Sequence, residues 1–72
     1  MKVLYTTDLS RPGNDVFINE SVSLIEQFNM YVVIKLFRVT GWSEREDATI
    51  LISTTDKDAA IKKYLNYGGT FN

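Results

Sequence analysis

The sequence predicts a small α+β domain in the order β-α-β-β-α, in which a three-stranded mixed sheet packs against two helices. Three observations lead to this class. The β-branched and aromatic run Tyr31–Val39 is typical of a strand. Apolar residues recur at helical spacing in residues 15–28 and again after Thr55. A length of 72 residues allows one domain, which we expect to span residues 1–72.

A short strand is expected near the start of the chain, because side chains of different polarity alternate there. The alternation places three side chains on one side of this strand: Val3, Tyr5 and Thr7. Pro12-Gly13 is a strong turn signal. Asn14 or Asp15 then serves as the N-cap of a helix, since either side chain accepts hydrogen bonds from free N–H groups of a first turn.

The segment Asp15–Phe28 allows two interpretations, of which we favour a helix. As a helix it carries a continuous apolar stripe, made of Phe17, Ile18, Val22, Leu24, Ile25 and Phe28. As a strand, it alternates Val22 and Leu24 with serines, and Asn29 lies in a hairpin turn. The second interpretation predicts a βββα chain, with an antiparallel sheet and one C-terminal helix.

The strand Tyr31–Val39 is apolar on both faces. One face carries Val32, Ile34 and Leu36, and the other carries Tyr31, Val33, Phe37 and Val39. This pattern is typical of a central strand, or of a strand whose second face meets another subunit. We expect it to pair with Ala48–Thr54 in an antiparallel hairpin, in which one face of the second strand carries Ala48, Ile50 and Ile52.

The last helix has signals at both ends. Thr55 is a suitable N-cap, and Asp58 three residues later resembles a capping box. Gly68-Gly69 ends the helix, because glycine accepts the left-handed conformation found at helix C-termini. We expect a buried stripe of Ala60, Ile61, Tyr64 and Leu65, and a solvated side of Lys57, Lys62 and Lys63.

The residue types that the chain lacks restrict its chemistry. It contains no cysteine and no histidine, which excludes disulfides, the usual zinc sites and the Ser-His-Asp and Cys-His arrangements of hydrolases. The four glycines match no phosphate-binding loop. We therefore expect a protein that is not an enzyme and has no cofactor, metal or small-molecule substrate.

Charge and hydropathy bear on location. The net charge of −1 directs the chain toward neither nucleic acid nor an anionic membrane. No stretch approaches the roughly 20 apolar residues of a membrane span, and the first residues lack the pattern of a signal peptide. A cytoplasmic location is expected.

A chain this short is marginally stable unless its core is supplemented. Without disulfides or metals, association is the supplement left, which indicates a homodimer or a protein partner of unknown identity. Tryptophan and arginine are common at the energetic centre of interfaces. We therefore predict partner contacts in the polar connection and on one face of the central strand, through Trp42, Glu44, Arg45, Glu46, Tyr31, Val33 and Phe37. Alternatively, Trp42 folds back over the hairpin and the charges only solvate the turn.

These observations favour a non-catalytic protein–protein interaction module that acts by steric occlusion. The alternative is a small RNA- or DNA-binding domain that uses a basic patch of Lys35, Arg38, Lys57, Lys62 and Lys63. Residues 33–69, with the helix Asp-Lys-Asp-Ala-Ala-Ile-Lys-Lys at 56–63, resemble a strand–turn–strand–helix element of many short phage and plasmid proteins. This resemblance implies an accessory protein of a phage or mobile element that inhibits or modulates a host defence protein.

Overall fold

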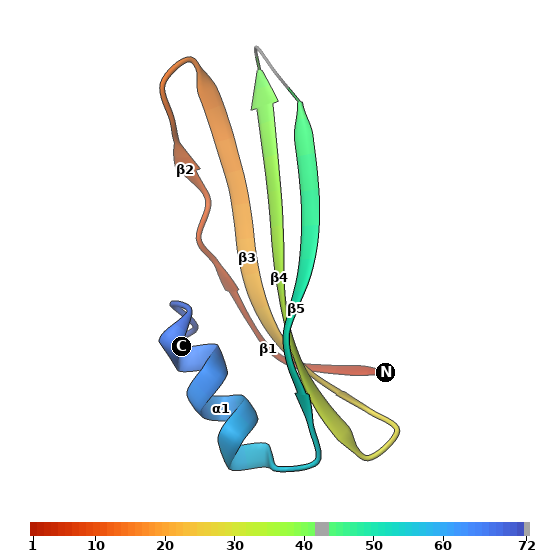
Figure 1. Cartoon of the computed structure of the whole chain (residues 1–72). Helices are drawn as coiled ribbons and strands as arrows, with labels where there is room; N and C mark the ends of the chain where they lie inside the picture. The colour runs from red at the N-terminus through yellow and green to blue at the C-terminus, as the bar shows by residue number, and fades with distance from the viewer. Residues whose placement is uncertain (42–43, 72) are drawn as a thin grey trace.

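The computed structural model describes residues 1–41 and 44–71, and it contains an antiparallel sheet and a C-terminal helix (Figure 1). The elements are β1 (Lys2–Asp8), β2 (Arg11–Pro12), β3 (Val16–Gln27), β4 (Met30–Gly41), β5 (Arg45–Thr54) and α1 (Lys57–Asn66). The strands lie in the order β1-β3-β4-β5, and the short β2 pairs with β3 on the β1 side. The predicted three-stranded mixed sheet with two helices is therefore wrong. The alternative, an antiparallel sheet with one helix, is closer, although the sheet has five strands.

The segment predicted as the first helix is the strand β3. It pairs along its whole length with β4, and its other edge pairs with β1 and β2. Phe28 and Asn29 join β3 to β4 with φ angles of 50° and 63°, as the two central residues of a type I′ hairpin turn require. The predicted N-cap at Asn14 or Asp15 is also wrong, because both residues lie in the turn between β2 and β3.

The helix α1 begins one residue later than predicted. Asp56 is the N-cap, and its carboxylate accepts hydrogen bonds from the backbone N–H groups of Asp58 and Ala59. Thr55 has no such role, so its prediction as N-cap is wrong. The helix ends before Gly68, whose φ of 92° confirms the predicted glycine stop. Among residues 1–41 and 44–71, no helix is long and apolar enough to cross a membrane.

The core lies between α1 and one side of the sheet. Ala60 and Tyr64 of α1 pack against Val22 and Leu24 of β3 and Val33 of β4, all fully buried. The rest of the predicted helix stripe is less buried, since Ile61 is half-buried and Leu65 exposed. The Tyr64 hydroxyl donates to the carbonyl of Thr70 at 2.7 Å and lies 2.5 Å from the hydroxyl of Thr7. This cluster fastens the last residues of the chain to β1.

Two register shifts change which side chains share a face. One bulge separates Val3 from Tyr5 in β1, and the other lies in β5 opposite the step from Val33 to Ile34. A single extra residue reverses the side to which the following side chains point. Val3 and Ile50 consequently point away from α1. The predictions that Val3 shares a face with Tyr5, and that Ile50 shares a face with Ile52, are therefore wrong.

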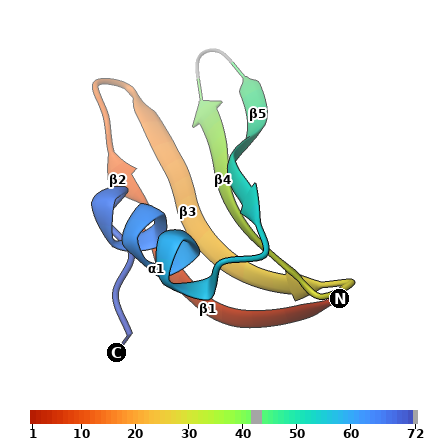
Figure 2. The ribbon, with the colours of Figure 1, turned by 60° about the horizontal axis from the view of Figure 1, so that its bottom comes forward.

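The molecule is longer and less compact than its size predicts. Its principal extents are 41 × 22 × 17 Å, and its radius of gyration is 13.2 Å, whereas a compact chain of this length has about 11 Å. The accessible surface of 5079 Å² likewise exceeds the roughly 4,500 Å² typical of this mass. Figure 2 shows the reason, because α1 lies on one side of a curved sheet and the ribbon leaves the other side bare.

Candidate interaction surface

The side of the sheet that faces away from α1 is named the open face. Paired residues of antiparallel strands point to the same side, and alternate residues point to opposite sides. Since Val22, Leu24 and Val33 point toward α1, the pairing assigns the apolar side chains of the open face. They include Val3, Phe17, Ile25, Met30, Val32, Ile34, Leu36, Ala48 and Ile50.

The apolar side chains of the open face are partly exposed to solvent. The exposed fraction is 52% for Val3, 48% for Leu36 and 64% for Ile50. Ile25 is buried between them, with 7% exposed, while Val32 and Ile34 are half-buried. A contiguous apolar surface of this kind is uncommon on a monomer and usually marks an interaction site.

The open face becomes polar toward the β4–β5 hairpin. A shallow depression of about 440 Å³ is lined there by side chains of three strands, which include Asn19, Ser21, Leu36, Arg38, Glu46 and Ala48. Arg38 and Glu46 face each other across the β4–β5 pairing. They therefore place one positive and one negative charge beside the apolar area.

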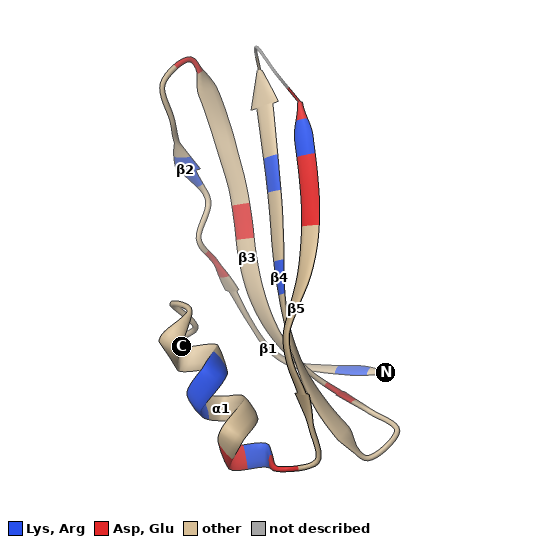
Figure 3. Cartoon of the chain, in the orientation of Figure 1, with Lys and Arg blue, Asp and Glu red and all other residues tan. Residues whose placement is uncertain are grey.

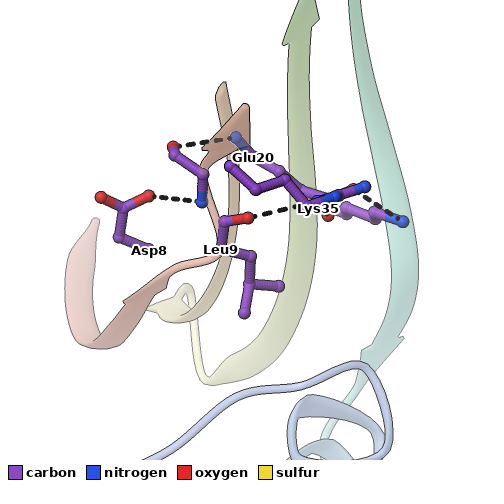
Figure 4. Close-up of polar contacts among 6 residues, drawn as sticks. Asp8, Leu9, Glu20 and Lys35 are labelled. Atoms are coloured by element: carbon purple, nitrogen blue, oxygen red, sulfur yellow. Dashed lines mark hydrogen bonds and ion pairs between the residues drawn. The ribbon is translucent and has the colours of Figure 1, made fainter. Parts of the chain in front are cut away.

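The α1 side of the sheet carries a buried carboxylate, Glu20, just beyond the helix (Figure 4). One of its oxygens accepts from Arg11 Nη1 at 2.7 Å, and the other lies 3.1 Å from Lys35 Nζ. The Arg11 hydrogen bond, opposed by burial and helped by Lys35, holds the pKa of Glu20 below its usual value. Since both oxygens are engaged by cations, this carboxylate is a poor proton donor.

The Glu20 backbone is tied to the same stretch of chain. The N–H of Leu9 donates to the Glu20 carbonyl at 2.7 Å, and the Glu20 N–H donates to the Ser10 hydroxyl at 3.2 Å. Ser10 N–H in turn donates to Asp8 at 2.9 Å. These bonds hold the link between β1 and β2 against β3, so the geometry indicates a structural role for the cluster.

The residues predicted to contact a partner are spread over several parts of the fold. Val33 is fully buried in the core and is therefore not accessible to a partner. Tyr31 and Phe37 lie on the α1 side and are half-buried. Glu44, Arg45 and Glu46 are exposed at the start of β5, and Trp42 lies outside the described residues. Of the predicted partner residues that the structure describes, the pairing assigns only Glu46 to the open face.

The predicted basic patch is divided. Lys35 points to the α1 side and pairs with Glu20, whereas Arg38, three residues later in the same strand, points to the open face. Lys57, Lys62 and Lys63 belong to α1 (Figure 3). The structure does not bring the five cations together on one surface.

Sequence reasoning placed the partner contacts of β4 on the face of Tyr31, Val33 and Phe37, which points toward α1, and it did not assign Val3, Ile25 and Ile50 to the opposite face. Ile25 lies on the open face because residues 16–27 form a strand. The strand interpretation of this segment, in which Ile25 points away from Val22 and Leu24, was the signal in the sequence. Val3 and Ile50 join the open face through the bulges, which leave no signal in the sequence.

Comparison of the chain with protein-family models, with curated proteins and with solved structures finds no match. Within the described ranges, no group of three acidic side chains is close enough to hold a metal ion.

Proposed function

We propose that the chain is a non-catalytic protein–protein interaction module whose binding surface is the open face. The observation that carries this proposal is the continuous apolar area from Val3 to Ile50 on a sheet whose other side already holds the core. Burial of one exposed leucine or isoleucine stabilises a complex by up to about 1.5–3 kcal/mol, before the costs of association are subtracted. Leu36 and Ile50 are thus the expected anchors.

The module acts by covering a surface of its partner. A paired sheet is rigid, so little conformational entropy is lost when it docks. The exposed charges Glu44, Arg45 and Glu46 lie at one end of this sheet, where they contribute orientation more than affinity. The resemblance of the C-terminal half to short phage and plasmid proteins supports a modulator of a host protein as the setting.

Nucleic-acid binding is the weaker alternative. Its five cations are divided among α1 and the two sides of the sheet, and Lys35 is paired with Glu20. A phosphate-binding surface instead needs several cations on one side.

Site-specific photo-crosslinking in lysate of the source cells tests the proposal. A photoreactive amino acid at position 36 or 50 is expected to form a covalent adduct with a protein. The same amino acid at position 65 is the control, because Leu65 on α1 is 46% exposed, close to the 48% of Leu36, but lies off the open face. The proposal fails if positions 36 and 50 give no protein adduct, or if position 65 gives the same adduct in equal yield.

A further inference from the structure

We propose that the partner on the open face is a second copy of this chain, packed face to face, an inference that rests on the proposed function. Two open faces would form a sandwich in which each copy covers the apolar side chains of the other. Three features of the molecule point to this occupant: the size of the face, its charges and the character of the sheet edges.

The size of the open face suits a dimer. The pairing of β3 with β4 spans 12 residues, and the sheet is four strands wide, β1-β3-β4-β5. Strand spacings of about 4.8 Å and a rise of about 3.4 Å per residue give a face of roughly 700 Å². A stable interface buries about 800 Å² per partner, so two such faces meet the lower end of the standard size.

The small size of the core also favours association. Only six apolar side chains are buried in the part of the chain that the structure describes: Val22, Leu24, Ile25, Val33, Ala60 and Tyr64. A domain of this size is marginally stable without a disulfide, a metal or association. Packing of the open faces would bury Val3, Leu36 and Ile50 as a second apolar layer.

The charges of the open face complement those of a second copy. Arg38 and Glu46 oppose each other in the β4–β5 pairing. In the described residues, however, the ion pairs are Arg11–Glu20, Lys35–Glu20 and Arg45–Asp47. Arg38 and Glu46 are therefore available to a partner. A second copy on the open face would therefore meet one base and one acid beside the apolar area.

The β5 edge of the sheet is less suited to self-association than the open face. β5 is an edge strand, and edge strands commonly pair with another chain. However, β5 starts with three charged residues, Arg45 to Asp47, and a bulge interrupts its middle. Charges and bulges are the devices that block edge pairing. A face-to-face arrangement is therefore favoured over a continuous sheet through β5.

Sedimentation velocity from micromolar to millimolar concentration tests the dimer. The wild type is expected to pass from monomer to dimer. Leu36→Lys should weaken the dimer at least tenfold, whereas Leu65→Lys, a change at a matched exposure on α1, should leave it unchanged. A wild type that stays monomeric at millimolar concentration would overturn the inference, as would equal weakening by the two variants.

Charge reversal gives a second test that does not depend on the apolar core. Arg38→Glu places a second acid beside Glu46, and Glu46→Arg places a second base beside Arg38, so each variant should repel its own copies. An equimolar mixture of the two should form a heterodimer at least as tight as the wild-type dimer. Independent sedimentation of the two variants in the mixture would contradict an interface that contains both residues.

The two proposals fail in different ways. If the wild type is monomeric but position 36 crosslinks to another protein, the interaction module stands and the second copy is excluded. If positions 36 and 50 crosslink to nothing and the wild type is monomeric, both proposals are wrong.

Discussion

At the scale of single residues, polar side chains outside the open face join segments that are distant in sequence. The Glu20 side chain connects β3 with β2 and β4, and the Tyr64 side chain connects α1 with β1 and the last residues. Each is a buried polar side chain with its partners in place, so its removal should cost stability. This makes both residues tests of the fold that are independent of any partner.

Glu20 should make stability depend on pH in the acid range. Because its pKa is lower in the folded chain than its usual value, its stabilisation is complete above that usual value and is lost as the pH falls through the folded pKa. Glu20→Gln should lower the free energy of unfolding at neutral pH by about 1–2 kcal/mol. The variant should also show a smaller fall in the free energy of unfolding as the pH is lowered, measured by urea unfolding at several pH values. Equal acid declines of the variant and the wild type would contradict this role.

The Tyr64 hydroxyl is expected to stabilise the fold measurably. Tyr64→Phe keeps the buried ring but removes the bonds to Thr7 and Thr70. The expected loss is about 1–2 kcal/mol, or roughly 5–15 °C in Tm for a domain of this size. Tyr67→Phe is the control, because Tyr67 is 44% exposed and its loss should stay within about 0.5 kcal/mol. Similar Tm values for the two variants would disprove the role of the cluster.

At the scale of elements, local signals predicted some features and failed for others. The ends of α1 were predicted to within one residue, since a cap and a glycine stop act over a few neighbouring residues. The strand β3 was missed because its apolar residues fit both a helical stripe and a strand. Its conformation is decided by pairing with β1, β2 and β4, partners that a local pattern does not reveal.

The same limit applies to the candidate site. The alternation of β4 separated Val32, Ile34 and Leu36 from the opposite set correctly. Which set faces outward depends on where α1 docks, and that is a property of the assembled fold. The bulges beside Val3 and Ile50 add to the open face and depend on the registers of the edge strands.

The β3–β4 turn offers a prediction at this scale. Phe28 is 89% exposed and has a φ of 50°, a conformation that disfavours large side chains. Phe28→Asn should raise the free energy of unfolding by about 0.5–1 kcal/mol, because asparagine tolerates the left-handed region. Phe28→Val should lower it, since a β-branched residue is strained there. Guanidinium unfolding of both variants checks the turn type. Destabilisation by Phe28→Asn together with stabilisation by Phe28→Val would rule out a type I′ turn.

At the scale of the whole molecule, one long sheet serves two purposes. Its α1 side supplies the core that lets the chain fold, and its open face keeps an apolar area that this core does not use. The excess of accessible surface over that of a compact chain of this mass reflects that division. Association through the open face would bring the buried fraction closer to that of a larger domain.

The most direct measurement is a dilution series of the wild-type protein followed by two-dimensional amide NMR. We expect concentration-dependent amide shifts at β4 residues 32–36 and β5 residues 46–50, alternate members of which carry side chains of the open face, and constant shifts over most of α1. Constant shifts everywhere, or changes confined to α1, would contradict the claim that two copies meet through this face.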